Sequence, residues 1–268
     1  MDIIVNGEID KIPDASIKIN RQANYQQHIL ECLGYGPEHL PMANLLKLYH
    51  QLPGRWIIAS PVHWEATHND ALITAAGSDL HLSDEESHLW FAEIVNFLKD
   101  DGFTPVYYNA NTWLFKIDNK PVINSQPLSA LLHKSLMPAL SALDKSYYWQ
   151  RLITELQMFL SAHSLNLNRQ NLPINGIWFW GEGDFEIPPA KKTIISDDPV
   201  LLLINTTRIN PLNLTIPWDG DELIIVNDPM QVESSGFREK IKKTKVNWYW
   251  NNCSYSVQPK SWWSKLWG

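Results

Sequence analysis

Residues 173–183 form the stretch that decides the fold: Pro173-Ile174-Asn175-Gly176-Ile177-Trp178-Phe179-Trp180-Gly181-Glu182-Gly183. Side chains alternate across a β-strand, so Trp178 and Trp180 share one face, and Ile177 and Phe179 share the other. A strand that is apolar on both faces is typical of a buried, central position in a sheet. This stretch therefore predicts a buried strand with turns at both ends.

Strand and helix patterns alternate on both sides of this stretch. Before it, we expect strands at residues 56–63 and 105–117 and helices at 41–51, 83–102, 127–143 and 148–161. Ser83 and Glu86 form a capping box for the second of these helices. After it, we expect strands at 193–195 and 222–226, a helix from Pro199, mostly helix at 234–250, and an extended segment at 255–267. This alternation predicts an α/β fold, with a mixed sheet and flanking helices.

Two regions are expected along the chain. Residues 1–54 would form an N-terminal segment packed on the body, and residues 55–268 would form the main domain. We expect the Pro188-Pro189 pair to mark an internal boundary near residues 188–190.

The composition is that of a globular protein, since 44% of the 268 residues are hydrophobic and 19% are charged. No apolar run reaches the roughly 18 residues of a membrane-spanning helix. The N-terminus lacks the basic and apolar regions of a signal peptide. With only two cysteines, we expect neither a disulfide framework nor a cysteine zinc site, and we expect a cytoplasmic protein. The thirteen tryptophans are scattered along the chain, which favours core positions for most of them.

No familiar catalytic motif occurs in the sequence. It has no Walker-type phosphate loop, dinucleotide fingerprint, GxSxG elbow or HExxH pair. Three segments, at residues 56–63, 163–169 and 173–183, nevertheless carry polar groups next to predicted strand or helix ends. We expect them to form a cleft for a small anionic ligand, because ligand sites of α/β sheets gather at such ends. The candidate ligand-binding residues are His63, Glu65, Asn166, Arg169, Gly181, Glu182 and Gly183.

Each of these segments also has a purely structural interpretation. His63 would bond a backbone carbonyl at a strand exit, and Arg169 would cap the preceding helix. Residues 173–183 would form the centre of a sheet. Asn166 and Arg169 in a loop are otherwise suited to bind a carboxylate, because arginine offers two parallel donors. The sequence leaves both interpretations open.

The segment 163–183 resembles the archaeal-type cofactor-independent phosphoglycerate mutases in Asn166, Arg169, Pro173, Asn175 and the Trp-x-Trp-Gly-x-Gly run. Residues 55–268 are more similar to the bacterial RpfE-type regulatory proteins, often labelled with the same activity. That similarity rests on the Trp-x-x-Ala-x-Pro-Val-His segment at 56–63, on Leu82, Ser83 and Glu86, and on the aromatic C-terminus at 262–267. The resemblance implies part of the phosphoglycerate mutase/alkaline phosphatase-like fold.

The departures from the mutase pattern bear on function. The resemblance implies two metal ions, with a first ligand in an N-terminal Asp-Gly motif, where this chain has Asn6-Gly7. No histidine follows Gly183, although Asp197 and Asp198 form an acidic pair. We therefore expect a binding or regulatory protein with no cofactor and no metal site. The alternative is a phosphoglycerate mutase or other phosphate-transfer enzyme that uses Mn²⁺ or Mg²⁺ at a site rebuilt from His63, Glu65, Arg169 and Glu182.

Charge is unevenly distributed. The net charge is −7, but residues 238–268 hold seven basic residues and one acidic residue, so this segment carries +6 and the remainder −13. On a helix, Arg238, Lys242 and Lys245 would share one face and could bind an acidic protein partner. Nucleic acid is expected to bind only through this segment, because the rest of the chain is acidic. The alternative is an ordinary solvated surface.

Overall fold

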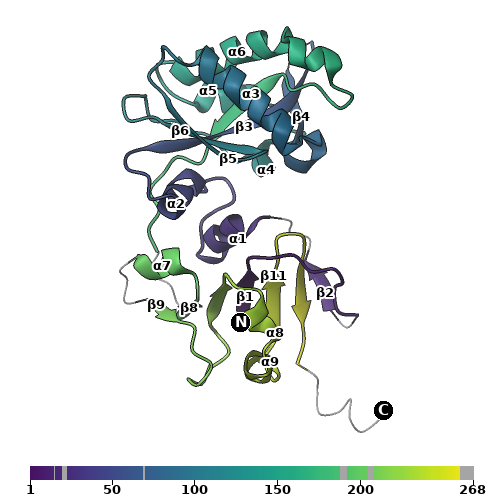
Figure 1. Ribbon diagram of the computed structural model, residues 1–268, viewed down its shortest axis with the longest axis vertical. Coiled ribbons are helices and arrows are strands. Elements are labelled where there is room, and N and C mark those ends of the chain that lie inside the picture. The colour runs from purple at the N-terminus through teal and green to yellow at the C-terminus, as the bar shows by residue number, and fades with distance from the viewer. Residues whose placement is uncertain (15, 20–22, 69, 188–191, 205–207, 260–268) are drawn as a thin grey trace. The chain divides into compact units, whose positions relative to one another are not determined.

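The computed structural model describes all residues except 15, 20–22, 69, 188–191, 205–207 and 260–268. The chain forms two compact units (Figure 1). We call Met1–Tyr35 with Glu186–Gly268 the split unit, and Gly36–Phe185 the continuous unit. The segment 1–54 contributes to both units. The predicted boundary at 188–190 and the aromatic residues 262–267 lie outside the described residues.

A seven-stranded sheet forms the centre of the split unit. Five neighbouring strands are parallel, and two further strands extend the sheet at one edge, each paired antiparallel with its neighbour. The strand order is β2 (Ser16–Ile19), β12 (Ser254–Val257), β11 (Val246–Tyr249), β1 (Asp2–Val5), β10 (Leu223–Val226), β8 (Ile194–Ser196) and β9 (Ile209–Pro211). The mixed sheet and its flanking helices confirm the predicted α/β class.

The central strand β1 was missing from the predicted elements. Ile3, Ile4 and Val5 are fully buried there, between β10 and β11. Three apolar residues are too short a run to identify a strand by periodicity. The burial comes from partners more than 200 residues away.

Both chain segments of this unit contribute helices. These are α1 (Tyr25–Cys32), α7 (Pro199–Leu203), α8 (Met230–Glu233) and α9 (Ser235–Ile241). Phe237 of α9 is fully buried and packs between the rings of Trp218 and Trp248. The predicted helix at 234–250 is wrong beyond Ile241. The chain turns and enters β11, because Val246 and Trp248 alternate into the core as strand residues.

The start of β1 carries a partly buried ion pair whose strength depends on pH. Lys192 Nζ lies 2.7 Å from Asp2 Oδ2, and Asn247 Nδ2 donates to Asp2 Oδ1 at 2.8 Å. Burial alone would raise the pKa of Asp2, but the hydrogen bonds from Lys192 and Asn247 and the charge of Lys192 outweigh it. The pKa therefore lies below its usual value.

Replacing Asp2→Asn is expected to destabilise the protein at neutral pH, and the loss should shrink as the pH falls. A carboxylate with a lowered folded pKa stabilises the fold fully above its unfolded pKa of about 3.9, and this contribution is lost as the pH falls through the folded pKa. Urea unfolding of both proteins between pH 7 and pH 3 would measure the difference. Asp14→Asn, which removes an exposed pair with Lys11, is the control and should change little at any pH.

An antiparallel sheet organises the continuous unit around one long strand, β3 (Trp56–Ala66). Ile58 pairs with both Leu114 and Trp180, so β6 and β7 lie on opposite edges of β3. β4 continues along the β6 edge. The remaining bounds are β4 (Ala71–Ala76), β5 (Thr104–Asn109), β6 (Thr112–Lys116) and β7 (Gly176–Trp180).

The predicted strand 177–180 is β7, and all five of its residues are buried. Among the described strands it pairs only with β3, so it is buried without being central in the sheet. β7 is buried because both of its faces are covered by other parts of the unit. Phe179 packs on Phe115 and on Trp149, while the Trp178 indole donates to the carbonyl of Gln126 at 2.9 Å.

The helices of this unit largely follow the predicted ranges. α3 (Asp84–Phe97) and α6 (Tyr148–Ser161) lie against the sheet and meet through Phe97 and Phe159 (Figure 1). The helix predicted at 127–143 consists of α4 (Leu128–Leu131) and α5 (Met137–Ala142), because Pro138 starts a new helix in its first turn. The others are α2 (Met42–Tyr49) and the 3₁₀ helices η1 (Gly77–Leu80) and η2 (Ser164–Asn168).

Candidate functional site

Asn175 and Gly176 join the loop before β7 to the end of β3. The Asn175 side chain acts like a strand residue, because its Oδ1 accepts from Trp64 N at 2.7 Å and its Nδ2 donates to Trp64 O at 2.9 Å. These bonds satisfy the Trp64 backbone beside a β-bulge at His63 and Trp64. The Trp64 indole lies directly over Gly176, where a Cβ would come within 2.1 Å of its Nε1.

Replacing Gly176→Ala is expected to cost about 1–3 kcal/mol, because the added methyl group overpacks the contact with Trp64. Chemical unfolding of the variant would measure this cost. Gly36→Ala is the matched control, since nothing lies within 4 Å of the added Cβ. Equal stability of the two variants would show that the Trp64 ring moves aside freely.

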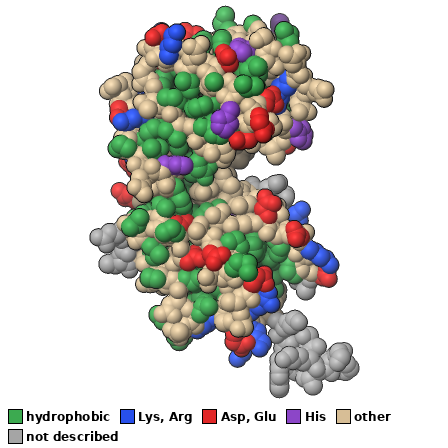
Figure 2. All heavy atoms as spheres, in the orientation of Figure 1, with side chains coloured by type: hydrophobic (Ala, Val, Ile, Leu, Met, Phe, Trp, Pro, Cys, Tyr) green, Lys and Arg blue, Asp and Glu red, His purple; other side chains and the backbone are tan. Residues whose placement is uncertain are grey.

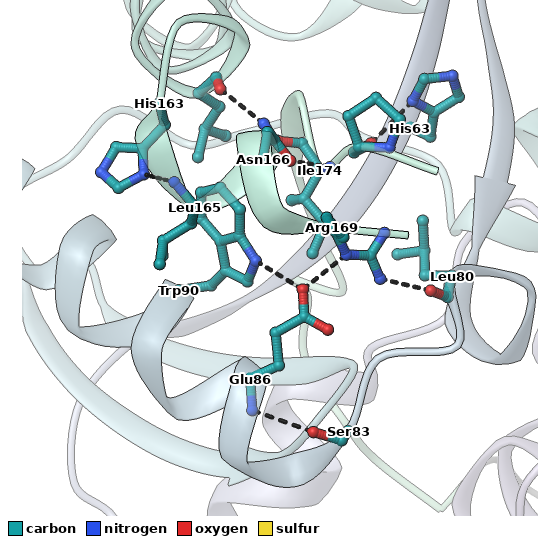
Figure 3. A network of polar contacts seen from close by, with 12 residues as sticks. His63, Leu80, Ser83, Glu86, Trp90, His163, Leu165, Asn166, Arg169 and Ile174 are labelled. Atoms are coloured by element: carbon teal, nitrogen blue, oxygen red, sulfur yellow. Dashed lines mark hydrogen bonds and ion pairs between the residues drawn. The ribbon is translucent and has the colours of Figure 1, made fainter. Parts of the chain in front are cut away.

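Arg169 is committed to an internal ion pair (Figure 3). Its Nε lies 2.6 Å from Glu86 Oε1, a second guanidinium nitrogen donates to the carbonyl of Leu80, and its side chain is only 2% exposed. Glu86 also accepts from the Trp90 indole at 3.3 Å. Its backbone N–H donates to the Ser83 hydroxyl, which confirms the predicted N-cap of α3. The Arg169 side chain is therefore enclosed, and its guanidinium cannot offer two parallel donors to a ligand.

Asn166 is a structural clamp between α6 and the loop before β7 (Figure 3). Its Nδ2 donates to the carbonyls of Leu160 and Ile174, both at 2.9 Å, and its Oδ1 accepts from Ile174 N at 2.9 Å. His63 is similarly placed: its Nδ1 lies 2.8 Å from Pro173 O, and its Nε2 lies 3.9 Å from Glu65 Oε1. The structural interpretation of a histidine bonded to a carbonyl thus matches the geometry.

The predicted cleft is divided between the two ends of the β3–β7 pair. Val62 pairs with Gly176 at one end, so His63 lies beside Asn175. Ile58 pairs with Trp180 at the other end, so the glycine segment 181–183 follows there. The two ends lie about 13 Å apart, at roughly 3.3 Å per residue over four residues. Antiparallel pairing therefore separates His63, Glu65, Asn166 and Arg169 from Gly181, Glu182 and Gly183.

Glu182 lies on a hollow that we call the charged cleft. Arg55 donates to Glu182 Oε1 through Nε at 2.9 Å and through a terminal nitrogen, and donates to Lys120 O at 3.1 Å. Ile123 N donates to Glu182 Oε2 at 2.9 Å, so both carboxylate oxygens are bonded. The cleft has a volume of about 390 Å³, and its walls are Asn44, Lys47, Arg55, Trp56, Val122, Ile123, Glu182, Gly183 and Asp184.

Two cations of the charged cleft were absent from the predicted site. Lys47 Nζ donates to the carbonyl of Gly54 at 3.1 Å, and the Arg55 side chain remains 38% exposed despite its ion pair. Gly181 and Gly183 have φ values of +84° and +139°, which let the loop turn back toward α2. Arg55 immediately precedes β3 and Glu182 soon follows β7. Antiparallel pairing of the two predicted strands is the one sequence signal that could have found this pair.

The carboxyl ends of the parallel strands in the split unit also carry polar groups. Asn6 Nδ2 donates to Asn227 Oδ1 at 3.0 Å, and Asp197 accepts from the backbone N–H groups of Asn227 and Asp228. Asp198, fully buried, accepts from the Tyr25 hydroxyl at 2.9 Å and caps α7. These side chains hold the loops that follow β8 and β10.

The predicted basic surface differs from a single helical face. Arg238 lies on α9, Lys242 is its C-cap and Lys245 follows the helix end. Arg238 pairs with Glu233, and Lys242 Nζ lies 3.2 Å from Glu239 Oε2. Figure 2 shows basic and acidic side chains intermingled around α9. Lys245 contributes a carbonyl that accepts from the N-terminal amine at 3.3 Å. Neighbouring acids therefore neutralise part of this charge.

Within the described residues, no three His, Cys, Asp or Glu side chains are grouped so that they could hold a metal ion. No helix in the same part of the chain is long and apolar enough to cross a membrane.

No protein-family model matches the chain, and no curated protein matches it. Among solved structures, it is similar to a cofactor-independent phosphoglycerate mutase from Thermoplasma acidophilum DSM 1728. The alignment covers 96% of this chain and 88% of that chain, at 12% sequence identity and a TM-score of 0.34. A similarity this weak assigns neither family nor function, so the RpfE-type resemblance remains a prediction from the sequence.

Proposed function

We propose that this protein is a binding protein whose ligand is a small anion held in the charged cleft. The observation that carries the proposal is the pair of cations there. Lys47 bonds a neutral carbonyl, and Arg55 is fixed by Glu182 and Lys120 while more than a third of its side chain stays exposed. A carboxylate or phosphate matches both groups, because lysine and arginine form short, charge-assisted bonds to such oxygens.

The cleft is organised before a ligand arrives. Three hydrogen bonds fix the Arg55 guanidinium, so little side-chain freedom remains to be lost on binding. Glu182 is bonded through both oxygens, which weakens its repulsion of an incoming anion. A regulatory role for this binding is supported only by the resemblance of residues 55–268 to the RpfE-type group.

The alternative is a metal-dependent phosphoglycerate mutase or other phosphate-transfer enzyme. Binding is favoured over it because Arg169 and Glu182 already serve internal ion pairs, and Asp197 and Asp198 hold backbone groups. Incubation with Mn²⁺ and 3-phosphoglycerate should give no turnover. A rate near the enzyme median of about 10 s⁻¹ would establish the alternative.

The same compound tests binding, because 3-phosphoglycerate carries both a carboxylate and a phosphate. Added without metal, it is expected to raise the melting temperature, since a ligand at 100 times its dissociation constant adds about 2.7 kcal/mol to stability. Lys47→Glu should abolish this shift. Lys99→Glu changes an exposed lysine that is not part of the cleft wall and should preserve it. Equal shifts in both variants would overturn the proposal.

A further inference from the structure

Lysines are concentrated in a part of the sequence that contains no acid. Residues 240–268 hold six lysines and neither aspartate nor glutamate. Because the whole chain carries −7, these six positive charges leave −13 for residues 1–239. The lysines form a first group, Lys240, Lys242, Lys243 and Lys245, and a second group, Lys260 and Lys265.

The hairpin of β11 and β12 returns the chain to the first group of lysines. Val246 opens β11 and pairs antiparallel with Val257, the last residue of β12. Residues that are directly opposite in such a pair lie about 5 Å apart. The chain therefore leaves β12 beside Lys245, and the second group of lysines begins three residues later.

Two exposed lysines of the first group have no carboxylate partner in the part of the chain that the structure describes. These are Lys243 and Lys245, on the stretch between α9 and β11. Their neighbour Lys242 differs, because its Nζ lies 3.2 Å from Glu239 Oε2. Lys243 and Lys245 are thus the lysines of this group whose charge is available to a partner.

A loop with two acids lies beside these lysines, since a Cβ added to Gly220 would come within 3.3 Å of the Thr244 side chain. Asp221 Oδ1 lies 3.7 Å from Lys192 Nζ, and Asp219 Oδ1 accepts from the Asp221 N–H at 3.0 Å. Both carboxylates therefore have partners of their own. Counted with these two aspartates, residues 238–268 hold seven basic and three acidic residues, a net charge of +4.

Residues 260–268, which we call the tryptophan segment, add apolar side chains to this charge. The segment reads Lys-Ser-Trp-Trp-Ser-Lys-Leu-Trp-Gly. Its large apolar residues are Trp262, Trp263, Leu266 and Trp267. Intervals of one and four residues would gather such side chains on one face of a helix, with Lys265 and the serines on the other. Tryptophan and leucine opposed to lysine are typical of segments that lie in a membrane interface. The segment is far shorter than the roughly 20 residues that span a membrane.

We propose that the tryptophan segment and the lysines before β11 together bind the surface of an anionic phospholipid membrane. An indole suits that surface, because its ring is apolar and its N–H is polar. One apolar anchor gives only marginal, reversible binding, and a basic patch is the second signal that strengthens it. Lys243 and Lys245 supply this patch, and Ile216, 58% exposed beside Lys240, adds apolar contact.

The apolar face favours a membrane over a nucleic acid. Bases stack on separate aromatic rings, and this stacking requires no leucine and no continuous apolar face. A membrane interface buries such a face as a whole. The proposal is independent of the charged cleft, which lies in the continuous unit.

Flotation of the full chain with lipid vesicles tests the charge. Vesicles of phosphatidylglycerol and phosphatidylcholine in equal parts should bind it at least about tenfold more tightly than phosphatidylcholine alone. The double variant Lys243→Glu/Lys245→Glu should lose most of this difference. Lys99→Glu/Lys134→Glu, which changes two exposed lysines of the continuous unit, is the matched control and should keep it.

The apolar contribution is tested by the triple variant Trp262→Ser/Trp263→Ser/Trp267→Ser. It should no longer float with the vesicles, while its circular dichroism and melting temperature stay unchanged. Leu167→Ser, which removes an apolar side chain that is 85% exposed, is the control and should float normally. Unfolding of the triple variant would show that these tryptophans pack inside the protein, and would overturn the proposal.

Equal binding to both kinds of vesicle, binding to neither, or unchanged binding in the lysine or tryptophan variant would also overturn it. Glycerol 3-phosphate should not release the protein from vesicles. Release would show that a free phosphate, rather than a bilayer, is recognised. Capture of a labelled single-stranded DNA without binding to vesicles would assign the segment to nucleic acid instead.

Discussion

Replacing Trp178→Ala is expected to lower the free energy of unfolding by about 3–5 kcal/mol, which is typical of removing a buried aromatic side chain. Trp178 is fully buried in β7, and its indole donates to the carbonyl of Gln126. The variant loses apolar burial, leaves a cavity and leaves the Gln126 carbonyl without its indole donor. A cost of this size approaches the whole stability of many domains.

Urea denaturation would measure the loss, with Leu167→Ala as control. Leu167 is 85% exposed, so its truncation should change stability by less than about 0.5 kcal/mol. A folded Trp178→Ala protein with an unchanged melting temperature would show that β7 is not a core strand.

Replacing Arg169→Met is expected to cost about 3 kcal/mol, because it leaves Glu86 without its charged partner. Removing one member of a buried ion pair usually costs 3–5 kcal/mol, and the lower end applies because the Glu86 side chain is 30% exposed. The Leu80 carbonyl also loses a donor. Chemical unfolding at neutral pH would measure the effect.

A double-mutant cycle separates the ion pair from the packing of the arginine stem. Glu86→Gln is combined with Arg169→Met, and the double variant should be more stable than the sum of the single losses implies. Additive losses would show that the pair has no coupling energy. 3-Phosphoglycerate should still bind the single variant Arg169→Met if that variant remains folded. Loss of that binding without unfolding would restore Arg169 to the ligand site.

Residues close together in the sequence determine several elements, independently of the tertiary structure. The strand at β7 follows from its apolar run between glycines, and the range of α6 matches its periodic pattern of Leu152, Leu156 and Leu160. The N-cap of α3 follows from Ser83, because a hydroxyl that accepts the Glu86 N–H requires only residues in one turn. In these cases the determining contacts lie within a few residues.

Other features depend on partners that are far apart in the chain. β1 is a strand because β10 and β11 enclose it, and β11 leaves the predicted helix because Trp248 finds a core there. Residue types alone could not decide whether Arg169 would face a ligand or a carboxylate, since Glu86 lies 83 residues away. Arg55 and Glu182 meet across 127 residues.

The sequence by itself therefore determined the α/β class, the buried strand and the polar residue types at its ends. Only the tertiary structure decided which of those polar groups remained available. A charged side chain satisfies its hydrogen bonds with whatever partner the fold brings within about 3 Å, and pairing between distant strands selects that partner. Antiparallel pairing of β3 and β7 placed Glu182 beside Arg55, and His63 at the opposite end.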